Sequence, residues 1–343
     1  ISVDPKEDMT PGATYELSVN GVESIFGEQI AGFTHSTVPQ DTTSPTTGER
    51  AVLVTNAPPA DDALGCQDEG VIVSDLTGQP INCVPVNSTL LQDKTISKQQ
   101  GDVYAELAFA PNFPEVTPLR VKKGGILKGD SLEVLIGGEV PVGFDSGEVT
   151  VQIISDATGY LFPNPNAESD QAPKNLRLFM DVAFSTEDAR SNGAFTQNLL
   201  HLELVGSGLI EDGQLNTDAI TIVEPRVLGV DNAYGVLSFR MESYQDQENA
   251  PLKPFDTVSP FVPVLDGDNG VELSWQPGNV ADRMEPGDPI IIHFNEVLEK
   301  ETIVADESLI LTKGGVSEPF SWKLDGSALI ITPDTPVEYG VEY

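Results

Sequence analysis

Apolar and polar residues alternate with a period of two through most of residues 101–244. Alternation of this kind is typical of strands that bury one face, because successive side chains of a strand point to opposite sides. Gly, Asp, Asn and Pro, which favour turns, separate the segments. Eight segments follow one another: DVYAELAFA, LRVKKGGIL, DSLEVLIGG, GEVTVQIIS, KNLRLFMDVAF, NLLHLELVGSG, DAITIVEP and GVLSFRMESY. This density of strands predicts a β-sandwich or jelly-roll with long loops.

The same alternation returns at both ends of the chain, and stretches without periodicity divide it. The N-terminal part contains two or three alternating segments and the C-terminal part contains five. Stretches rich in Pro, Thr, Asp and Gln between them are typical of linkers. We predict tandem β-sandwich (Ig-like) modules that flank a larger β-sandwich or jelly-roll-like middle domain. The predicted bounds are a partial module at 1–38, a linker at 39–50, a middle all-β domain at 51–244 with an irregular lobe at 51–100, a linker at 245–260, and a module lacking its last strands at 261–343.

Length and composition agree with an all-β chain. At 343 residues it is longer than one ordinary domain, so two or three domains are expected. Hydrophobic residues make up 39%, which is enough for packed cores. The 31 Gly and 26 Pro residues exceed the average share, as many short strands joined by turns would require.

The charge of the chain is strongly acidic. There are 54 acidic and 18 basic residues, a net charge of −36, and the acids are spread along the chain. A solvated acidic surface explains this distribution. A field of this sign opposes the binding of nucleic acid and of anionic membranes. It leaves open solubility in salty surroundings, repulsion between neighbouring modules and attraction of Ca²⁺.

The two ends of the chain share a sequence phrase. Without any gap, ALIITPDTPVEYGVEY at 328–343 matches the beginning of the chain, so that Gly340 falls on Gly12 and Tyr343 on Tyr15. Gly can take a positive φ in the corner, and the tyrosine can lay its ring on the core while its hydroxyl reaches the backbone. We therefore expect a tyrosine corner at both ends. The echo also suggests one period of a longer array, either cut in mid-domain or completed by strand donation between copies.

Residues 261–343 resemble the bacterial Ig-like domain that occurs in tandem in S-layer proteins and large surface adhesins. The resemblance is carried by IIIHFNEVLEKETI, LILTKGGV and ALIITPDTPVEYGVEY. Residues 1–38 resemble the later part of the same domain, although Ser24 stands where that family usually has Asp. The resemblance implies Ig-like sandwiches at both ends and a role on the bacterial surface. The middle domain resembles no family.

The two cysteines, Cys66 and Cys83, are not arranged as a zinc site, because neither belongs to a CxxC pair and no His lies nearby. The stretch between them could run out and back and bring the sulfur atoms together. We favour a disulfide, which indicates an oxidising compartment; two buried free thiols are the alternative. No stretch approaches the ~20 apolar residues of a membrane span.

Calcium is the one metal that the sequence suggests. Asp266, Asp268 and Asn269 lie in one Gly-flanked turn and resemble the start of a calcium loop, although a plain β-turn explains them too. The histidines His35 and His201 lie far apart in predicted strands, as does the third. No nucleophile, phosphate-loop or metalloprotease motif is present. We therefore predict no catalytic residue, no required cofactor and no enzymatic activity.

These observations predict a non-enzymatic structural or adhesive segment of a large exported bacterial surface protein. It would act as a spacer or assemble filaments or layers through its β modules. Its partners would be copies of itself or neighbouring modules, with a surface glycan or protein as a further ligand and no nucleic acid. Two alternatives are a ligand- or glycan-binding middle domain and an extracellular hydrolase, which would need two carboxylates in a cleft. The expected location is extracellular, at the bacterial cell surface.

Overall fold

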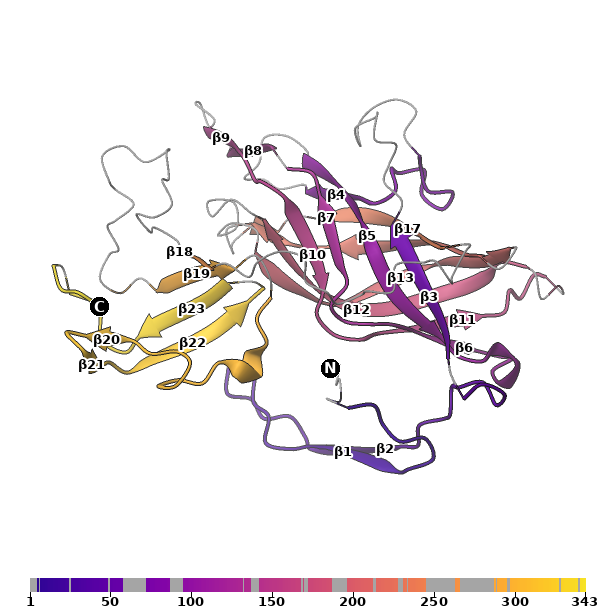
Figure 1. The fold of residues 1–343 in the computed structure, drawn as a ribbon, viewed down its shortest axis with the longest axis horizontal. Helices are drawn as coiled ribbons and strands as arrows, with labels where there is room; N and C mark the ends of the chain where they lie inside the picture. Colours follow the sequence, from indigo (N-terminus) through magenta and orange to yellow (C-terminus); the bar gives the residue numbers. More distant parts are fainter. Residues whose placement is uncertain are drawn as a thin grey trace.

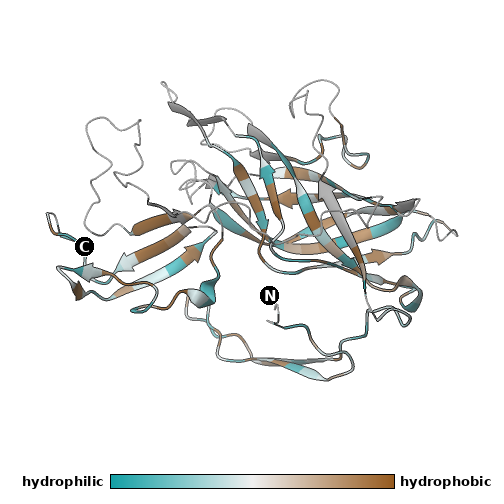
Figure 2. Ribbon diagram, in the orientation of Figure 1, coloured by the Kyte–Doolittle hydropathy of each residue, from teal (hydrophilic) through white to brown (hydrophobic). Residues whose placement is uncertain are grey.

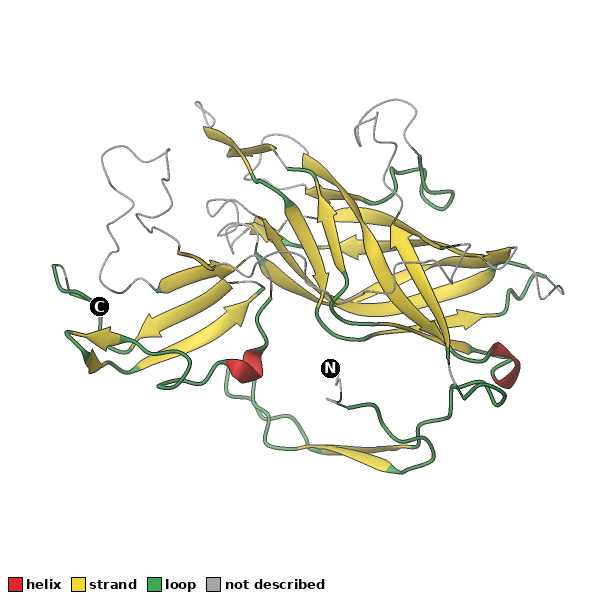
Figure 3. Cartoon of the chain, in the orientation of Figure 1, coloured by secondary structure: helices red, strands yellow, loops and turns green. Residues whose placement is uncertain are grey.

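A computed structural model gives the fold, and strands dominate it (Figure 3), so the all-β prediction is confirmed. The structure describes residues 5, 7–24, 26–48, 50–57, 72–86, 95–131, 133–136, 142–167, 169, 172–186, 196–211, 214–227, 231–232, 234–244, 263–265, 287, 289–294, 297–326, 328–338 and 340–343. The strands before the middle of the chain are β1 (Tyr15–Val19), β2 (Phe33–Thr37), β3 (Ala51–Ala57), β4 (Cys83–Val86), β5 (Thr95–Leu107), β6 (Thr117–Val121), β7 (Ile126–Gly129), β8 (Glu133–Ile136), β9 (Val142–Asp145), β10 (Val149–Ile153) and β11 (Ala157–Phe162).

The second half of the chain continues in the same way. Its strands are β12 (Lys174–Thr186), β13 (Gln197–Glu211), β14 (Gln214–Val223), β15 (Arg226–Val227), β16 (Asp231–Asn232), β17 (Gly235–Ser243), β18 (Pro263–Leu265), β19 (Ile290–Phe294), β20 (Thr312–Lys313), β21 (Val316–Ser317), β22 (Phe320–Asp325) and β23 (Ala328–Pro333). The described residues also include the short 3-10 helices η1 (Ala110–Asn112) and η3 (Lys300–Thr302).

Strands β3–β7, β10–β14 and β17 form a sheet that closes on itself. Neighbours run β5–β3–β17–β14–β13–β12, and the ring is completed because β12 also pairs with β10, β10 with β7, and β7 with β5. A second link runs from β12 through β11 and β6 back to β5. Figure 1 shows β3, β5, β7 and β10 as one wall, with β12 and β13 in another. Eight strands closed in this way enclose an interior just wide enough for side chains or one small ligand.

A β-bulge lets β12 serve two neighbours, β11 along its first half and β10 along its second. The register with β13 shifts between Met180 and Val182. The intervening Asp181 is held through both carboxylate oxygens: the His201 backbone N–H donates to Oδ1 at 2.6 Å and the Ser155 hydroxyl to Oδ2 at 2.8 Å. A bulge bends its strand. This bend brings β10 and β11 onto the same edge of one long strand.

The interior of the closed sheet is apolar because alternate residues of its strands face inward (Figure 2). In β14, buried and more accessible positions alternate from Leu215 to Ala219 and on to Val223. Burial of apolar area at these positions is the main stabilising term of the fold. The core cluster comprises Val103, Ala105, Leu119, Val121, Leu127, Ile153, Ala157, Leu161, Leu176, Leu178, Leu204, Ala219, Phe239 and Met241.

The described residues of the predicted irregular lobe (51–57, 72–86 and 95–100) belong to the closed sheet or pack against it and are not an appendage. Strand β4 pairs with β5 beyond the point where β3 ends, so β3 and β4 share one place in the ring. Just before β4, Ile81 bridges Ser238 of β17. The Asn82 side chain donates to the carbonyl of Arg240 at 3.1 Å and accepts from its N–H at 2.9 Å. Ile81 and Asn82 are completely buried.

The two ends of the chain form the same local corner, as predicted from the shared phrase. In each, the tyrosine hydroxyl accepts a hydrogen bond from a backbone N–H five residues earlier, at 2.8 Å for Tyr15 and 3.2 Å for Tyr343. Gly12 has φ 78° and Gly340 has φ 72°, a conformation that favours glycine. The predicted tyrosine corner is therefore confirmed at both ends.

Each hydrogen-bonded sheet stays within one predicted segment. Strands β1 and β2 form a hairpin, and β18, β19, β23 and β22 form a four-stranded sheet beside the closed sheet (Figure 1). The C-terminal module touches the closed sheet where the Val297 backbone N–H donates to Gln152 Oε1 of β10 at 3.1 Å. The described strands of residues 261–343 comprise one four-stranded sheet and the β20–β21 hairpin, so the Ig-like sandwiches and the domain bounds stay predictions.

Substitution of Gly206 by Ala should destabilise the fold. A Cβ there would overlap the backbone carbonyl of Asp218 on the neighbouring strand, and backbone cannot move aside as a side-chain end can. We expect a loss of about 1–3 kcal/mol or more in the free energy of unfolding, measured by urea denaturation. Gly208→Ala is the matched control, because its Cβ would meet only side-chain atoms of Leu161, Leu215 and Thr217 at 3.1–3.7 Å. Equal stability of both variants would contradict the close approach of β13 and β14.

Candidate functional site

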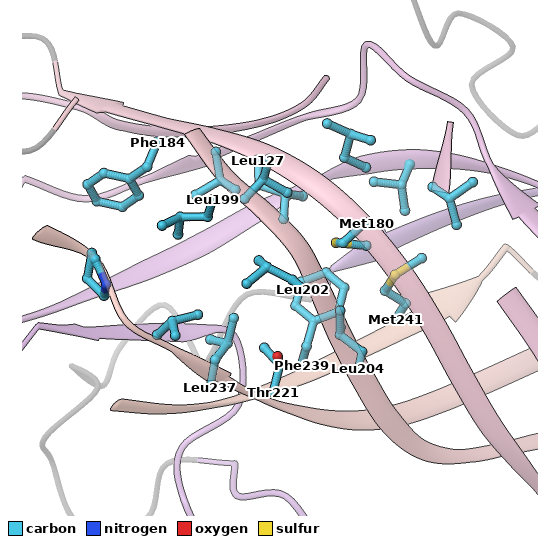
Figure 4. Close-up of a pocket in the computed structure, with 17 residues that line it drawn as sticks. Leu127, Met180, Phe184, Leu199, Leu202, Leu204, Thr221, Leu237, Phe239 and Met241 are labelled. Carbon is cyan, nitrogen blue, oxygen red and sulfur yellow. The ribbon is translucent and has the colours of Figure 1, made fainter. Parts of the chain in front are cut away.

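The interior of the closed sheet contains an apolar cavity of about 70 Å³ (Figure 4). It lies toward the end of the ring where β12 and β14 finish and β13 and β17 begin. Its lining residues are Val103, Val121, Leu127, Val151, Ile153, Met180, Val182, Phe184, Leu199, Leu202, Leu204, Thr221, Val223, Pro225, Leu237, Phe239 and Met241.

The strand period selects which residues line the cavity. Along β17, Leu237 and Phe239 face it, and along β14 Val223 does. The neighbouring positions on each strand point outward. Ile222 of β14 pairs with Val236 of β17, and their side chains are 66% and 46% exposed. The inner face of the sheet therefore makes most of the cavity, and Pro225, in the loop after β14, completes the lining.

No charged side chain lines the cavity, and Thr221 carries its one hydroxyl group. That hydroxyl lies 3.5 Å from the carbonyl oxygen of its neighbour Ile222. An apolar cavity stays dry, because a water molecule needs two to four polar partners, and it accepts apolar guests instead. A guest in this cavity would thus be held by apolar contacts and not by hydrogen bonds.

A second, smaller cavity of about 20 Å³ lies further along the same interior. Two residues, Val121 and Met241, line both cavities. The smaller cavity is lined by Ala105, Leu119, Val121, Leu176, Leu178, Leu215, Thr217 and Met241.

The C-terminal module lies near the end of the ring that holds the larger cavity. Gln152, which accepts from Val297, stands between the lining residues Val151 and Ile153. Gly326, between β22 and β23, lies so close to Thr196 and Gln197 that a Cβ there would contact them at 2.7–3.0 Å. Gln197 begins β13, two residues before the lining residue Leu199.

The residues singled out by sequence do not meet at this cavity. Asp266, Asp268 and Asn269, predicted for calcium, lie outside the described residues, as does Cys66. Cys83 is disulfide-bonded and 4% exposed. Among the described residues, no group of three or more His, Cys, Asp and Glu side chains could hold a metal ion.

Two of the histidines occupy separate sheets. His35 lies in the exposed strand β2, and His201 stacks on Phe179 with a ring separation of 5.3 Å. Sequence reasoning missed the cavity altogether. Its signal was present in the alternating segments, but alternation does not tell which inward residues leave space between them.

A polar cluster lies on the outside of β5 and β6. Glu106 Oε2 accepts from Arg50 at 2.9 Å and from Arg120 at 2.6 Å. Asp8, from the N-terminal segment, accepts from Arg120 at 2.6 Å, and this hydrogen bond lowers the pKa of Asp8 to about 2. Asp156 adds a contact of 3.5 Å to Arg120. Because Asp8 of the N-terminal segment is paired with Arg120 of β6, we interpret the cluster as a clamp that holds this segment on the closed sheet.

Comparison with known proteins gives one direction for function. No protein-family model matches the chain, and no solved structure is similar to it. The chain is similar to alkane uptake protein B of Marinobacter nauticus, with 36% identity over 294 residues, which is 80% of this chain and 27% of that protein. This chain thus spans about a quarter of its relative. A match over 80% of the chain must include most of the closed sheet.

This similarity corrects the functional prediction. A structural or adhesive segment, with the filament and S-layer roles attached to it, is contradicted because the relative is named for alkane uptake. The coarser part of the predicted location, the bacterial cell envelope, agrees with the relative, since uptake takes place at the envelope. No helix in the described part of the chain has the length and apolar composition needed to span a membrane.

The clamp predicts a specific dependence of stability on pH. The folded pKa of Asp8 lies below the ordinary value of 3.8, so its contribution is complete above that value and is lost as pH falls toward about 2. Asp8→Asn should therefore lower the melting temperature at pH 6, and the difference from wild type should vanish near pH 2.

Glu7→Gln is the matched control, since it removes the same charge from an exposed neighbour for which the described contacts include no ion pair. Melting curves of the three proteins at pH 2, 4 and 6 test the prediction. A pH-independent difference for Asp8→Asn would show that its charge does not hold the clamp.

Proposed function

We propose that the closed sheet binds the hydrocarbon chain of an alkane or alkyl compound, as the ligand-binding part of a protein for hydrocarbon uptake. The observation that carries the proposal is the cavity of about 70 Å³ whose lining has no charged side chain. The similarity to a protein named for alkane uptake, over a segment that must include most of this sheet, points to the same ligand class.

The hydrophobic effect supplies the affinity. Each methylene group that leaves water for the cavity contributes about 0.8 kcal/mol, and a dry cavity adds no cost for breaking hydrogen bonds to the protein. A glycan is a poor ligand for the same cavity, because its hydroxyl groups would lose water without finding partners. Neither cavity of the described residues is lined by a carboxylate, so neither supports the predicted alternative of a hydrolase.

The acidic surface fits a carrier of neutral ligands. A net charge of −36 keeps separate copies apart and in solution, while an uncharged alkane is not repelled. An aliphatic guest therefore enters by apolar contact alone. The proposal keeps the prediction that the chain is not an enzyme and requires no cofactor.

We place the chain outside the cytoplasm. The disulfide of Cys83 supports an oxidising compartment, because thiols in the cytoplasm are kept reduced. The buried position of Cys83, next to the completely buried Asn82, makes its bond part of the closed sheet's support. The extracellular side of the envelope, and assembly with other copies, stay predictions.

Displacement of a fluorescent dye tests the proposal. The full chain is loaded with 1-N-phenylnaphthylamine, an apolar dye, and n-dodecane is added; we expect dodecane to displace the dye and to raise the melting temperature. Val223→Phe fills the cavity from β14 and should weaken dodecane binding at least tenfold. Val223 is 4% exposed, so its larger replacement has no way out to solvent.

Ile222→Phe is the matched control, because the neighbouring Ile222 is 66% exposed and does not line the cavity. Its binding of dodecane should equal that of wild type. If dodecane does not displace the dye from wild type, the proposal is refuted. If it displaces the dye equally from Val223→Phe and from wild type, the ligand binds outside this cavity.

A further inference from the structure

The larger cavity is too small for a whole alkane as it stands. An apolar cavity of about 150 Å³ accepts benzene, and the volume here is about 70 Å³. A chain of many carbons would therefore need further space along the interior. The smaller cavity, of about 20 Å³, lies in the same interior and offers part of that space.

The two cavities lie in line along the closed sheet. On β14, Val223 and Thr221 line the larger cavity, and Thr217 and Leu215 line the smaller one. At ~3.3 Å per residue, this stretch of strand is about 25 Å long. A long, narrow interior fits an unbranched chain better than a ring.

Met241 and Val121 separate the two cavities, because both residues line each of them. Val121 is β-branched and 1% exposed, so its side chain is stiff and enclosed. Met241 is unbranched with three rotatable bonds, which lets its thioether adopt other positions without moving the backbone. Figure 4 shows Met241 on the opposite side of the cavity from Phe184. Of the two dividing side chains, Met241 is the one that can move aside.

Small residues keep room beyond this division. Gly159 and Gly208 face the leucines there, and a Cβ on Gly208 would reach Leu215 and Thr217, which line the smaller cavity. A Cβ on Gly159 would reach Leu119 and Leu178, which line it as well. The absence of a Cβ at Gly159 and Gly208 therefore leaves space beside the side chains that line the smaller cavity.

We propose that the two cavities are one channel for an unbranched alkyl chain, closed in the middle by Met241, and that displacement of Met241 sets the length of chain that the protein accepts. The inference rests on the proposed function and deepens it. An alkyl chain that outgrows the larger cavity swings the Met241 side chain away and extends toward Leu215.

The test is the dependence of affinity on chain length, measured on the full chain by dye displacement with n-alkanes from octane to hexadecane. In wild type, affinity should rise about fourfold per added methylene and then level off. Met241→Ala should move the levelling point to longer alkanes. Met241→Phe should move it to shorter ones and lower the hexadecane-to-octane affinity ratio at least tenfold.

Met180→Ala is the matched control, since Met180 lines the larger cavity and not the smaller one. It should change the affinity for all alkanes by a similar factor and leave the levelling point in place. Melting curves establish that each variant is folded, and Met241→Phe keeps the test decisive if Met241→Ala is too unstable.

The outcomes separate the two proposals. Suppose that wild type binds dodecane but both Met241 variants level off at the same alkane length as wild type, or that Met180→Ala moves the levelling point as far as a Met241 variant does. The division by Met241 is then wrong, and the proposed function stands. If no alkane displaces the dye from wild type, the proposed function itself is wrong.

Discussion

The pairing of β12 with neighbours on both of its edges is the constraint on which the rest of this structure depends. Through it the strands of the closed sheet form a ring, and their inward side chains face one another. Closure requires β12 to bend, and the bulge at Asp181, held by His201 and Ser155, supplies the bend. The apolar interior and its cavities are consequences of this closure.

Closure also explains why the other segments are attached where they are. Strand β4 and the residues before it complete the ring next to β17, so the disulfide-bonded Cys83 at the start of β4 supports the wall and not a separate lobe. The N-terminal segment is held on the outside by Asp8 and Arg120, and the C-terminal module contacts Gln152 at the end nearest the larger cavity. Both cavities are thereby lined by uncharged side chains.

An apolar interior that is incompletely filled has a cost in stability, because each void loses contacts that a packed core would make. Here the space is bounded by flexible methionines and by glycines where larger residues would fill it. Such a lining is adaptable, which suits ligands that differ only in length. The acidic outer face of the sheet thus provides solubility, and its apolar inner face provides the proposed binding site.

The sequence by itself determined that the chain is all-β, where most of its strand segments lie and that both ends carry the same tyrosine corner, because these features depend on local period and turn residues. It did not predict β11, and it placed β6 and β7 in one segment. It did not reveal which face of a strand points inward. In β14 the more apolar Ile222 is 66% exposed, whereas Thr221 is 5% exposed and lines the cavity. Only pairing with β13 and β17 fixes that choice, since a shift of one residue would exchange the two faces. The closure of the sheet, and with it the candidate site, was therefore decided by the tertiary structure.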